Sequence, residues 1–409
     1  MHTLDALLEE LVLPHDGNSL PDINGLVAGF TDSKRTKYLA AKGVKRFDKM
    51  DPVTTDTRLA FFSCTKTITA MAVLQLYEKG QIDLDAPAKK YLPMISEIGL
   101  IDPGQVDDDT GEFIKPPRKP KNDVTVRHLL LHTAGFAYVF TDPDYFNIVM
   151  NKHREHTGAT PSLRMFSTDV MPLVFEPGTS WRYGHSSDWL GLVVEAVTGM
   201  KFSQYLQKNI FDPAGLSSFT FRIDNEDQLI PISMRKDDGT LRVLRKKPVP
   251  HQPSIDMGGQ GCFGTVGDFL QFMRIWLNKG LCVETGAQIL KKETVEYAIQ
   301  AHLPEGIHVE LDTAMTGEAP SDFLPDNFTL TGCAYNMNNL PTGRPRGSIY
   351  WAGLASLYFW IDFENDVAGF YGCQILPYLD SPCLVGYIRY ENAVYDMLRK
   401  EREAIKGKL

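Results

Sequence analysis

The sequence predicts an α+β fold, an α/β sandwich in which the two ends of the chain form one antiparallel sheet with flanking helices. Two observations indicate this arrangement. Short β-favouring runs occur near both termini, and helical patterns dominate the residues between them. We therefore expect residues 1–65 and 265–409 to form the sheet domain and residues 66–264 to form an inserted, mainly helical domain. The active site is expected at the seam between the two.

The N-terminal part predicts a helix followed by a hairpin. Residues 1–11 have the spacing of an acidic amphipathic helix and lack the basic segment of a secretory signal. Residues 25–30 and 37–43 are short strand-like segments, and the polar residues 32–34 between them are typical of a turn. We expect this hairpin to belong to the sheet.

Three longer helices are expected farther along the chain. Residues 66–79, 189–197 and 266–277 carry apolar side chains at helical spacing, and a glycine closely follows each segment. Residues 103–122 are rich in Pro, Gly, Asp and Lys, which predicts an irregular insertion. The aromatic loop of residues 136–146 is expected to cover a pocket.

The C-terminal part predicts a second hairpin and a final helix. Residues 348–362 and 367–374 are aromatic, β-favouring runs, and the polar residues 364–366 between them predict a turn. Residues 386–403 predict a helix that packs on the resulting sheet.

The composition is that of an ordinary globular protein, with 43% hydrophobic and 23% charged residues among 409. The formal net charge of −9 repels nucleic acid and anionic membrane surfaces. No apolar run approaches the roughly 18 residues of a membrane span. We therefore expect a cytoplasmic protein that contacts neither nucleic acid nor membrane. The terminal Gly407-Lys408-Leu409 resembles a peroxisomal Ser-Lys-Leu ending, but glycine replaces the serine.

The usual signals for metals and cofactors are missing. The six cysteines are scattered and form no Cys-x-x-Cys pair, so neither a metal site nor a disulfide framework is expected. Residues 259–264 match Gly-x-Gly-x-x-Gly, but no apolar strand leads into them, and we interpret them as a tight loop. We expect no cofactor.

The strongest candidate for chemistry is the pair Ser63 and Lys66 at the start of the first longer helix, where both side chains lie on one face. Serine needs a base to become a nucleophile, and lysine can serve once burial and the positive helix N-terminus disfavour its charged form. In isolation, an N-cap serine followed by a surface lysine would explain the pair equally well. A second Ser-x-x-Lys copy, from Ser233 to Lys236, precedes a turn and is interpreted as a chance match.

Two further segments offer groups that can assist Ser63. Tyr183 follows a Pro-Gly turn, and a tyrosine near a lysine can transfer protons, although packing is the commoner role of a single tyrosine. His185 ranks below Tyr183, because no Gly-x-Ser-x-Gly elbow accompanies it. Residues 348–355 offer backbone N–H groups that, with that of Ser63, would form an oxyanion hole, although an ordinary aromatic strand explains them as well.

In this order, the segments resemble the serine β-lactamase and penicillin-binding-protein superfamily. Residues 124–136, Val-Thr-Val-Arg-His-Leu-Leu-Leu-His-Thr-Ala-Gly-Phe, are similar to a characteristic segment of that family. Within it the chain looks most like the class C-like esterases and the fungal lovastatin-type acyltransferases, over about residues 20 to 400. The resemblance implies a β-lactamase-like fold.

The resemblance also implies roles for individual residues. Ser63 would be the acylated nucleophile, Lys66 its base, and Tyr183 the partner acid and base. Ser186 lies where relatives often carry an asparagine that contacts the acyl carbonyl, so the chain departs from the family pattern there.

A second departure lies near the end of the chain, where Trp351-Ala352-Gly353 takes the place of the Lys-Thr-Gly of the β-lactamases. Leu354 would then supply the second N–H of the oxyanion hole. Because Trp351 and Ala352 cannot bind the carboxylate of a β-lactam, and no Ser-Asp-Asn motif is present, antibiotic hydrolysis is disfavoured. An apolar tryptophan suits an uncharged acyl or polycyclic group.

We therefore predict a cofactor-free serine enzyme that forms an acyl-Ser63 intermediate from an ester or thioester and passes the acyl group to an alcohol of a small molecule in secondary-metabolite biosynthesis. An acyl carrier protein or acyl-coenzyme A would fit as the donor. Hydrolysis by a carboxylesterase is the main alternative, because both fates use the same nucleophile and oxyanion hole. A non-catalytic binding module and a β-lactamase are the remaining alternatives.

Overall fold

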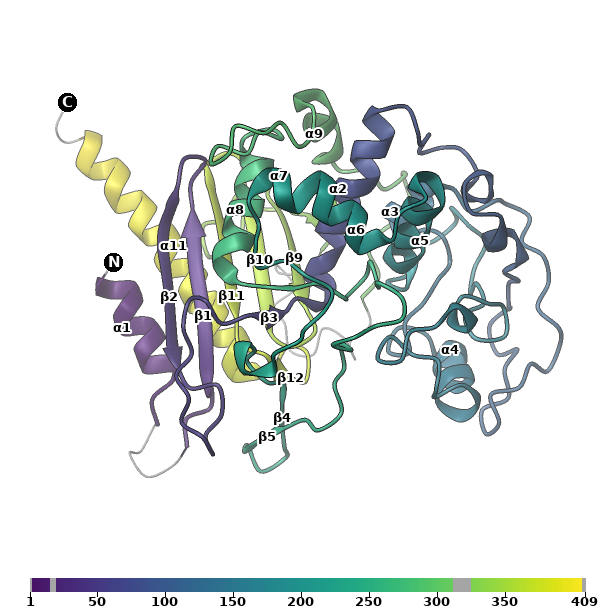
Figure 1. Ribbon diagram of the computed structural model, residues 1–409, viewed down its shortest axis with the longest axis horizontal. Helices are drawn as coiled ribbons and strands as arrows, with labels where there is room; N and C mark the ends of the chain where they lie inside the picture. Colours follow the sequence, from purple (N-terminus) through teal and green to yellow (C-terminus); the bar gives the residue numbers. More distant parts are fainter. Residues whose placement is uncertain (1, 15–19, 312–324, 407–409) are drawn as a thin grey trace.

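A seven-stranded antiparallel sheet forms one end of the molecule (Figure 1). The computed structural model describes residues 2–14, 20–311 and 325–406. In spatial order the strands are β2 (Thr36–Gly43), β1 (Gly25–Thr31), β11 (Val367–Gly372), β10 (Leu357–Asp362), β9 (Ile349–Gly353), β8 (Ala334–Tyr335) and β7 (Asn327–Phe328). Because β1 pairs with β11, segments from both ends of the chain lie side by side, and the predicted α+β fold is confirmed.

The central strands are buried because their residues are almost all apolar or small. Every residue of β1 and of β11 is buried, whereas β2 at one edge of the sheet is only partly buried. In β9, buried Ile349, Trp351 and Gly353 alternate with the more exposed Tyr350 and Ala352. The two sets therefore face opposite sides of the sheet.

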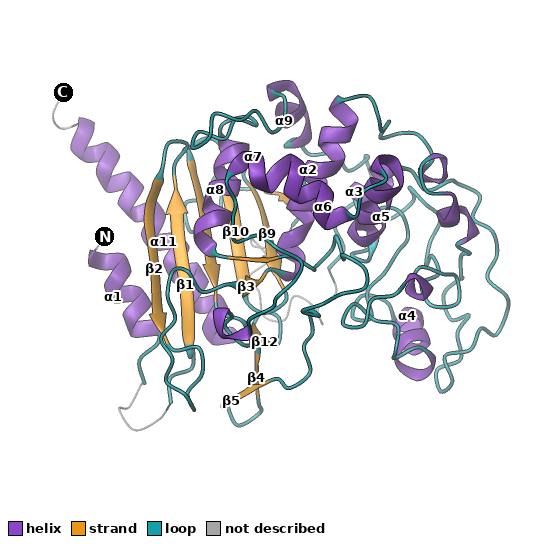
Figure 2. Cartoon of the chain, viewed as in Figure 1, coloured by secondary structure: helices purple, strands orange, loops and turns teal. Residues whose placement is uncertain are grey.

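Helices cover both faces of the sheet (Figure 2). On one face, α8 (Val266–Leu277) packs against β1 and β11 and buries Phe269 and Trp276. On the other face, α1 (His2–Leu11) and α11 (Ser381–Lys406) pack against each other and bury an apolar cluster that includes Leu8 and Tyr390. The sheet is thus the middle one of three layers.

The middle of the chain is mainly helical and surrounds α2 (Thr65–Glu78). Since α2 is buried from Thr65 to Leu76, it is a core helix, and it packs against α5 (Ser186–Thr198). The other α-helices given for the described residues are α3 (Val126–Leu130), α4 (Pro143–Asn147), α6 (Phe202–Leu206), α7 (Asp212–Ala214) and α9 (Lys292–Ala298). The short strands are β3 (Leu59–Ala60), β4 (Ser233–Arg235), β5 (Leu241–Val243), β6 (Phe263–Gly264) and β12 (Ile375–Leu376).

Most predicted elements are present, with shifted ends. The hairpin of β1 and β2 and the helices α1, α2 and α8 match the expected segments, and residues 103–122 contain no helix or strand. The expectation for residues 348–362 was wrong, because this run is two strands, β9 and β10, with a tight turn between them. The turn contains Leu354 and Ala355, which are not turn-forming residues, and Ser356 takes a φ of 57°. The last helix begins at Ser381 rather than at residue 386.

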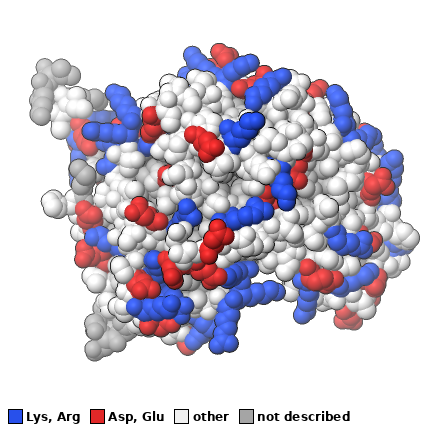
Figure 3. Space-filling view, viewed as in Figure 1, with Lys and Arg blue, Asp and Glu red and all other residues white. Residues whose placement is uncertain are grey.

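The surface shown in Figure 3 carries positive and negative side chains interspersed with neutral ones. None of the helices in the described part of the chain is both long and apolar enough to cross a membrane. All six cysteines lie in that part, and each is buried and free. The terminal residues 407–409, which resemble a peroxisomal signal, lie outside the described residues.

Candidate active site

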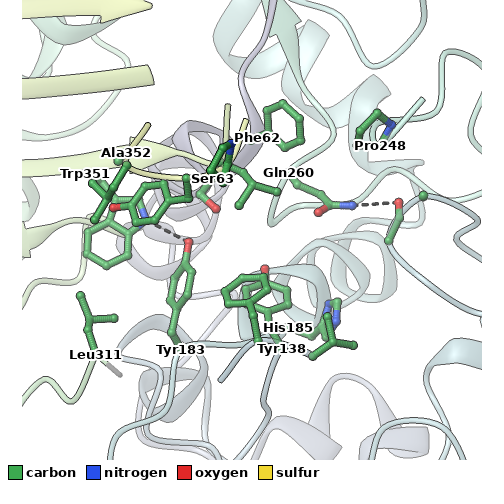
Figure 4. Close-up of a pocket in the computed structure, with 18 of the residues that line it drawn as sticks. Phe62, Ser63, Tyr138, Tyr183, His185, Pro248, Gln260, Leu311, Trp351 and Ala352 are labelled. Atoms are coloured by element: carbon green, nitrogen blue, oxygen red, sulfur yellow. Dashed lines mark hydrogen bonds between the residues drawn. The ribbon is translucent and has the colours of Figure 1, made fainter. Parts of the chain in front are cut away.

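A cavity of about 450 Å³ lies where strand β9 meets the start of α2 and the loops of the middle part. Its wall is mainly aromatic and aliphatic, and Figure 4 shows Ser63, Tyr138, Tyr183 and Trp351 around it. Tyr138 belongs to the aromatic loop of residues 136–146, which was expected to cover a pocket and does line this one. The cavity therefore brings together residues from distant parts of the sequence.

Ser63 is held by a rigid backbone segment. The side-chain amide of Gln374 hydrogen-bonds to both backbone groups of Ala60 at 3.0 Å, and the N–H of Phe61 donates to the carbonyl of Cys262 at 2.9 Å. Phe62 has a φ of 47°, an unusual value for a bulky residue. Such strain persists only where the surroundings impose it, and it presents the partly exposed Ser63 to the cavity.

Lys66 is buried next to Ser63 and has three polar neighbours. Its Nζ lies 3.1 Å from Ser63 Oγ, 3.0 Å from the Tyr138 hydroxyl and 2.8 Å from the carbonyl oxygen of Gly259. A neutral amine satisfies this set, because it donates to two oxygens and accepts the proton of the serine hydroxyl.

The charge state of Lys66 follows from its surroundings. Burial lowers the pKa of Lys66 from 10.5 to about 7, although the carboxylate of Asp188 and the thiol of Cys64 favour the charged form. A large fraction of the lysine is therefore neutral at physiological pH, which a general base requires.

Tyr183 lines the same cavity, and its hydroxyl group stays protonated. Burial raises the pKa of Tyr183 well above its ordinary value. The indole N–H of Trp351 donates a hydrogen bond to the Tyr183 hydroxyl oxygen at 3.0 Å (Figure 4). Since this oxygen already accepts a bond, the hydroxyl proton can be donated elsewhere, and Ser63 lies beside Tyr183 in the wall of the same cavity. Lys66 Nζ also lies 4.7 Å from the centre of the tyrosine ring.

The segment that resembles the family motif at residues 124–136 supports Tyr183 from behind. The ring of His132 packs 5.0 Å from the ring of Tyr183, and its Nδ1 accepts a bond from the N–H of Gly184 at 3.4 Å. Arg127 forms a two-pronged ion pair with Asp85. The motif therefore holds the tyrosine loop in place and contributes no side chain to the cavity wall apart from the aromatic loop that follows it.

Sequence reasoning missed the network that positions Lys66. Asp188 is fully buried, and its carboxylate accepts from the N–H of Gly259 at 2.7 Å and contacts Nδ1 of His185 at 2.8 Å. Gly259 in turn presents its carbonyl to Lys66, and a Cβ at this glycine would lie 2.8 Å from the Asp188 carboxylate. Residues 259–262 form a tight loop ahead of β6, and this loop also contacts Lys66 through the carbonyl of Gly259. The contact of Tyr138 with Lys66 was missed as well.

His185 contacts the network around Asp188. Its ring packs edge-on against Tyr138 at 4.3 Å, and its hydrogen-bond partner is Asp188. No hydrogen bond between His185 and Ser63 is present among the described residues. The lower rank given to His185 agrees with this geometry.

Strand β9 supplies one wall of the cavity. Trp351 and Leu354 line it, and Gly353 lies so close to the backbone before Ser63 that a Cβ there would be 2.6 Å from the carbonyl of Phe61. Ser186 does not line the cavity. Its Oγ is fully buried at the start of α5, and it has no hydrogen-bond partner among the described residues.

No group of three or more potential metal ligands occurs in the described ranges 2–14, 20–311 and 325–406. The polar side chains that line the cavity carry hydroxyl and imidazole groups, one amide and one guanidinium group, and the Lys66 amine contacts the lining residue Ser63. A serine and a lysine in hydrogen-bonding contact, with a protonated tyrosine beside them, are the groups that a serine acyl-transfer site of the β-lactamase-like type requires.

Comparison with known proteins agrees with this class. The beta-lactamase family model matches residues 18–382, so the chain belongs to the beta-lactamase family. It is 27% identical to monacolin J acid methylbutanoyltransferase of Aspergillus terreus, over 88% of this chain and 87% of that protein. It is 29% identical to a lovastatin esterase of Penicillium rubens, over 87% of this chain and 90% of that protein.

A solved structure also matches almost the whole chain. A mutant of simvastatin synthase from Aspergillus terreus superposes with a TM-score of 0.80 at 25% sequence identity, covering 97% of this chain and 95% of that one. The predicted resemblance, the β-lactamase-like fold and the class of serine acyltransferases and ester hydrolases are thereby confirmed.

Proposed function

We propose that the protein transfers an acyl group from an ester or thioester to an alcohol of a small molecule through an acyl-Ser63 intermediate, as a step in secondary-metabolite biosynthesis. One observation carries the proposal. The buried Lys66 amine lies 3.1 Å from Ser63 Oγ at the wall of an apolar cavity, with a pKa lowered to about 7.

In the acylation step, the neutral Lys66 takes the proton of Ser63 while Oγ attacks the carbonyl carbon of the donor. The carbonyl oxygen becomes negatively charged and is bound by the backbone N–H groups of Ser63 and Leu354, which both line the cavity. The bond to the leaving alcohol or thiol then breaks, and the leaving group takes up a proton.

Tyr183 supplies that proton in our proposal. Because its pKa is raised, Tyr183 is a proton donor and relay at neutral pH rather than a phenolate base, and Lys66 restores the tyrosine proton. An acceptor alcohol then attacks the acyl-serine ester by the reverse sequence, which returns the proton to Ser63. Trp351 holds the tyrosine oxygen in position throughout.

Two features support small, largely apolar substrates and a role in biosynthesis. The cavity wall near Ser63 is aromatic, and Trp351 and Ala352 take the place of the carboxylate-binding Lys-Thr of the β-lactamases. One relative is named as a methylbutanoyltransferase acting on monacolin J acid. A thioester of coenzyme A or of an acyl carrier protein fits as the donor.

Ester hydrolysis is a second candidate, because another relative of similar identity is named a lovastatin esterase. Water replaces the acceptor alcohol in that case, and the residues act in the same way.

The first test is intact-protein mass spectrometry after brief incubation with a short-chain aryl ester. We expect an adduct of the acyl mass on the wild type that maps to Ser63 and is absent from Ser63→Ala. Ser233→Ala, from the second Ser-x-x-Lys copy, is the matched control and should acylate normally. Absence of both adduct and ester turnover in the wild type would instead favour a binding protein without catalysis.

Adding acceptor alcohols then separates transfer from hydrolysis. If the enzyme is a transferase, a suitable alcohol discharges the acyl-enzyme and suppresses release of the free acid. Unchanged hydrolysis across a broad set of alcohols would identify an esterase.

A further inference from the structure

The cavity extends beyond the catalytic groups to a second region on the other side of β9. Arg344, Tyr350, Tyr358 and Tyr387 line this region, which we call the Arg344 arm, and they line the same cavity as Ser63. Tyr350 faces the side of the sheet opposite to Trp351, the side covered by α11, and Tyr387 lies on that helix. A substrate that reacts at Ser63 can therefore reach into the arm.

Arg344 is the unusual residue of the arm, because it is buried and two of its three guanidinium nitrogens have no hydrogen-bond partner among the described residues. Its side chain is 1% exposed, and its Nε and Nη1 have no hydrogen-bond partner among the described residues. The ring of Tyr350 stacks over the guanidinium group at 4.3 Å and offers no hydrogen-bond acceptor in that direction. Buried charged donors are normally satisfied, so this arrangement points to an acceptor that residues 2–14, 20–311 and 325–406 do not supply.

Glu391 forms an ion pair with Arg344 but leaves Nε and Nη1 without a hydrogen bond. Its Oε1 lies 3.4 Å from Arg344 Nε, a distance and geometry that give an ion pair but no hydrogen bond, and the same oxygen accepts the hydroxyl of Tyr387 at 3.2 Å. A guanidinium group has five N–H donors, of which this contact occupies one edge at most. The hydroxyl of Tyr358 has no hydrogen-bond partner in the described part of the chain either.

We propose that Arg344 binds a carboxylate of the substrate, and that this enzyme therefore acts on small acids in which a chain or ring system separates the carboxylate from the reacting ester or hydroxyl. Planar two-pronged pairing with a carboxylate is what a guanidinium group does best. The proposal rests on the proposed function, since it places the reacting end of the substrate at Ser63. It adds the substrate class and a specificity-determining residue.

Charge balance is compatible with an anionic ligand. Arg344 and Glu391 together are neutral when both are ionised, so a second carboxylate adds one negative charge. Burial raises the pKa of Glu391, and uptake of one proton by Glu391 therefore restores the balance when the ligand binds. A purely structural ion pair between the loop before β9 and helix α11 is the competing explanation of the same contacts.

Binding measurements on Ser63→Ala separate the two explanations without turnover. The probes are ω-hydroxyalkanoates of increasing chain length, each compared with its own methyl ester by isothermal titration calorimetry. At the length that spans the cavity, the acid should bind about ten- to a hundredfold more tightly than the ester. A parallel series of mono-4-nitrophenyl dicarboxylates and their methyl esters shows whether the carboxylate belongs to the acyl donor instead.

Two added substitutions test the residue itself. Glu391→Gln keeps Arg344 and removes the competing charge, so the preference for the acid should increase. Arg344→Met combined with Glu391→Gln leaves no unpaired charge and should abolish the preference. A structural ion pair predicts no preference for the acid at any length, and a preference that survives in the double variant would also overturn the proposal.

If the double variant fails to fold, the single variant Glu391→Gln still tests the proposal, because it retains the guanidinium group. If it folds, as judged by near-ultraviolet circular dichroism, and its preference for the acid is unchanged or reduced, Arg344 is not the carboxylate ligand. Acylation of Ser63 is measured separately on the wild type. Acylation without acid preference would refute only the role of Arg344, and acid preference without acylation would refute only the proposed reaction.

Discussion

Replacing Lys66 by methionine should inactivate the enzyme and at the same time stabilise the fold. The cost of burying the lysine amine is set by the difference between its ordinary pKa of 10.5 and its pKa of about 7 in the folded protein. At about 1.4 kcal/mol for each tenfold change in the proton equilibrium, this cost is on the order of 5 kcal/mol at or below neutral pH.

Methionine does not recover the whole amount. It leaves Ser63 Oγ, the Tyr138 hydroxyl and the Gly259 carbonyl without the contacts they make to Lys66, and each lost hydrogen bond costs about 1 kcal/mol. We therefore expect the free energy of unfolding of Lys66→Met to exceed that of the wild type by about 2 kcal/mol at pH 6 to 7. Removal of the base should lower the acylation rate by at least about a hundredfold.

The pH dependence gives the sharper test. Between pH 7 and 10.5 the lysine is protonated in the unfolded chain and neutral in the folded one, so the unfolded state binds more protons and wild-type stability increases with pH. The variant lacks this term. Its advantage should therefore be fully present below pH 7 and decrease by about 1.4 kcal/mol per pH unit above it.

Urea unfolding followed by circular dichroism, at pH values from 6 to about 9.5, measures these differences directly. Lys236→Met is the matched control, since Lys236 is the exposed lysine of the second Ser-x-x-Lys copy and should change neither activity nor stability. A Lys66→Met protein that is less stable than the wild type at pH 6, or a difference that does not vary with pH, would refute the neutral buried lysine.

Three further outcomes follow from the geometry of the site. The wild-type acylation rate with an aryl ester, measured by stopped flow, should rise with pH through a midpoint near 7 as Lys66 loses its proton; a flat profile would exclude Lys66 as the base. Asp188→Asn removes a carboxylate that favours the charged lysine, so this midpoint should move to lower pH, and an upward shift would contradict the assignment. Gly353→Ala places a Cβ 2.6 Å from the carbonyl oxygen of Phe61 and should displace the segment that holds Ser63. We expect the acylation rate to fall about a hundredfold while the stability of the rest of the fold stays similar. Unimpaired acylation would show that the close approach of the two backbones is not needed.

The parts of the site that the sequence predicts are the local ones. Ser63 and Lys66 are three residues apart, so the period of the helix alone places both side chains on one face. Tyr183 and Trp351 are far away in the sequence, and the order of family motifs was needed to select them from many aromatic residues. Their hydrogen bond at 3.0 Å could be found only in the structure.

The missed residues act through contacts that leave no local pattern. The carbonyl of Gly259 reaches Lys66 across 193 positions of the sequence, and any residue type has such a carbonyl. Asp188 has the appearance of an ordinary acidic residue in the first turn of a helix, which is a favourable place for one. Ser186 lies in the same turn, at the position where relatives often carry an asparagine that contacts the acyl carbonyl. Its Oγ is nevertheless buried in the protein interior and not in the cavity wall. Tertiary packing decides such cases, and the sequence pattern does not contain it.

The fold was predictable because the hydrophobic patterns of its helices and strands are periodic and recur along the chain. Buried strands and amphipathic helices recur along the chain, and the ends of elements are the least determined feature. The break between β9 and β10 was missed because Leu354 and Ala355 carry no turn signal, although Leu354 then lines the cavity. A departure from the local rules thus coincides with the functional site.

Base activation and acyl transfer share one physical cause in this site. In β-lactamases, by the resemblance, the strand carries a lysine where this chain has Trp351, and a second cation near Lys66 would itself disfavour the charged form of that lysine. Here burial against aromatic side chains lowers the pKa of Lys66 instead. The same apolar wall disfavours water near the acyl-serine and favours an acceptor that brings its own apolar surface. A site that makes its base by desolvation therefore also favours transfer to an apolar acceptor over hydrolysis.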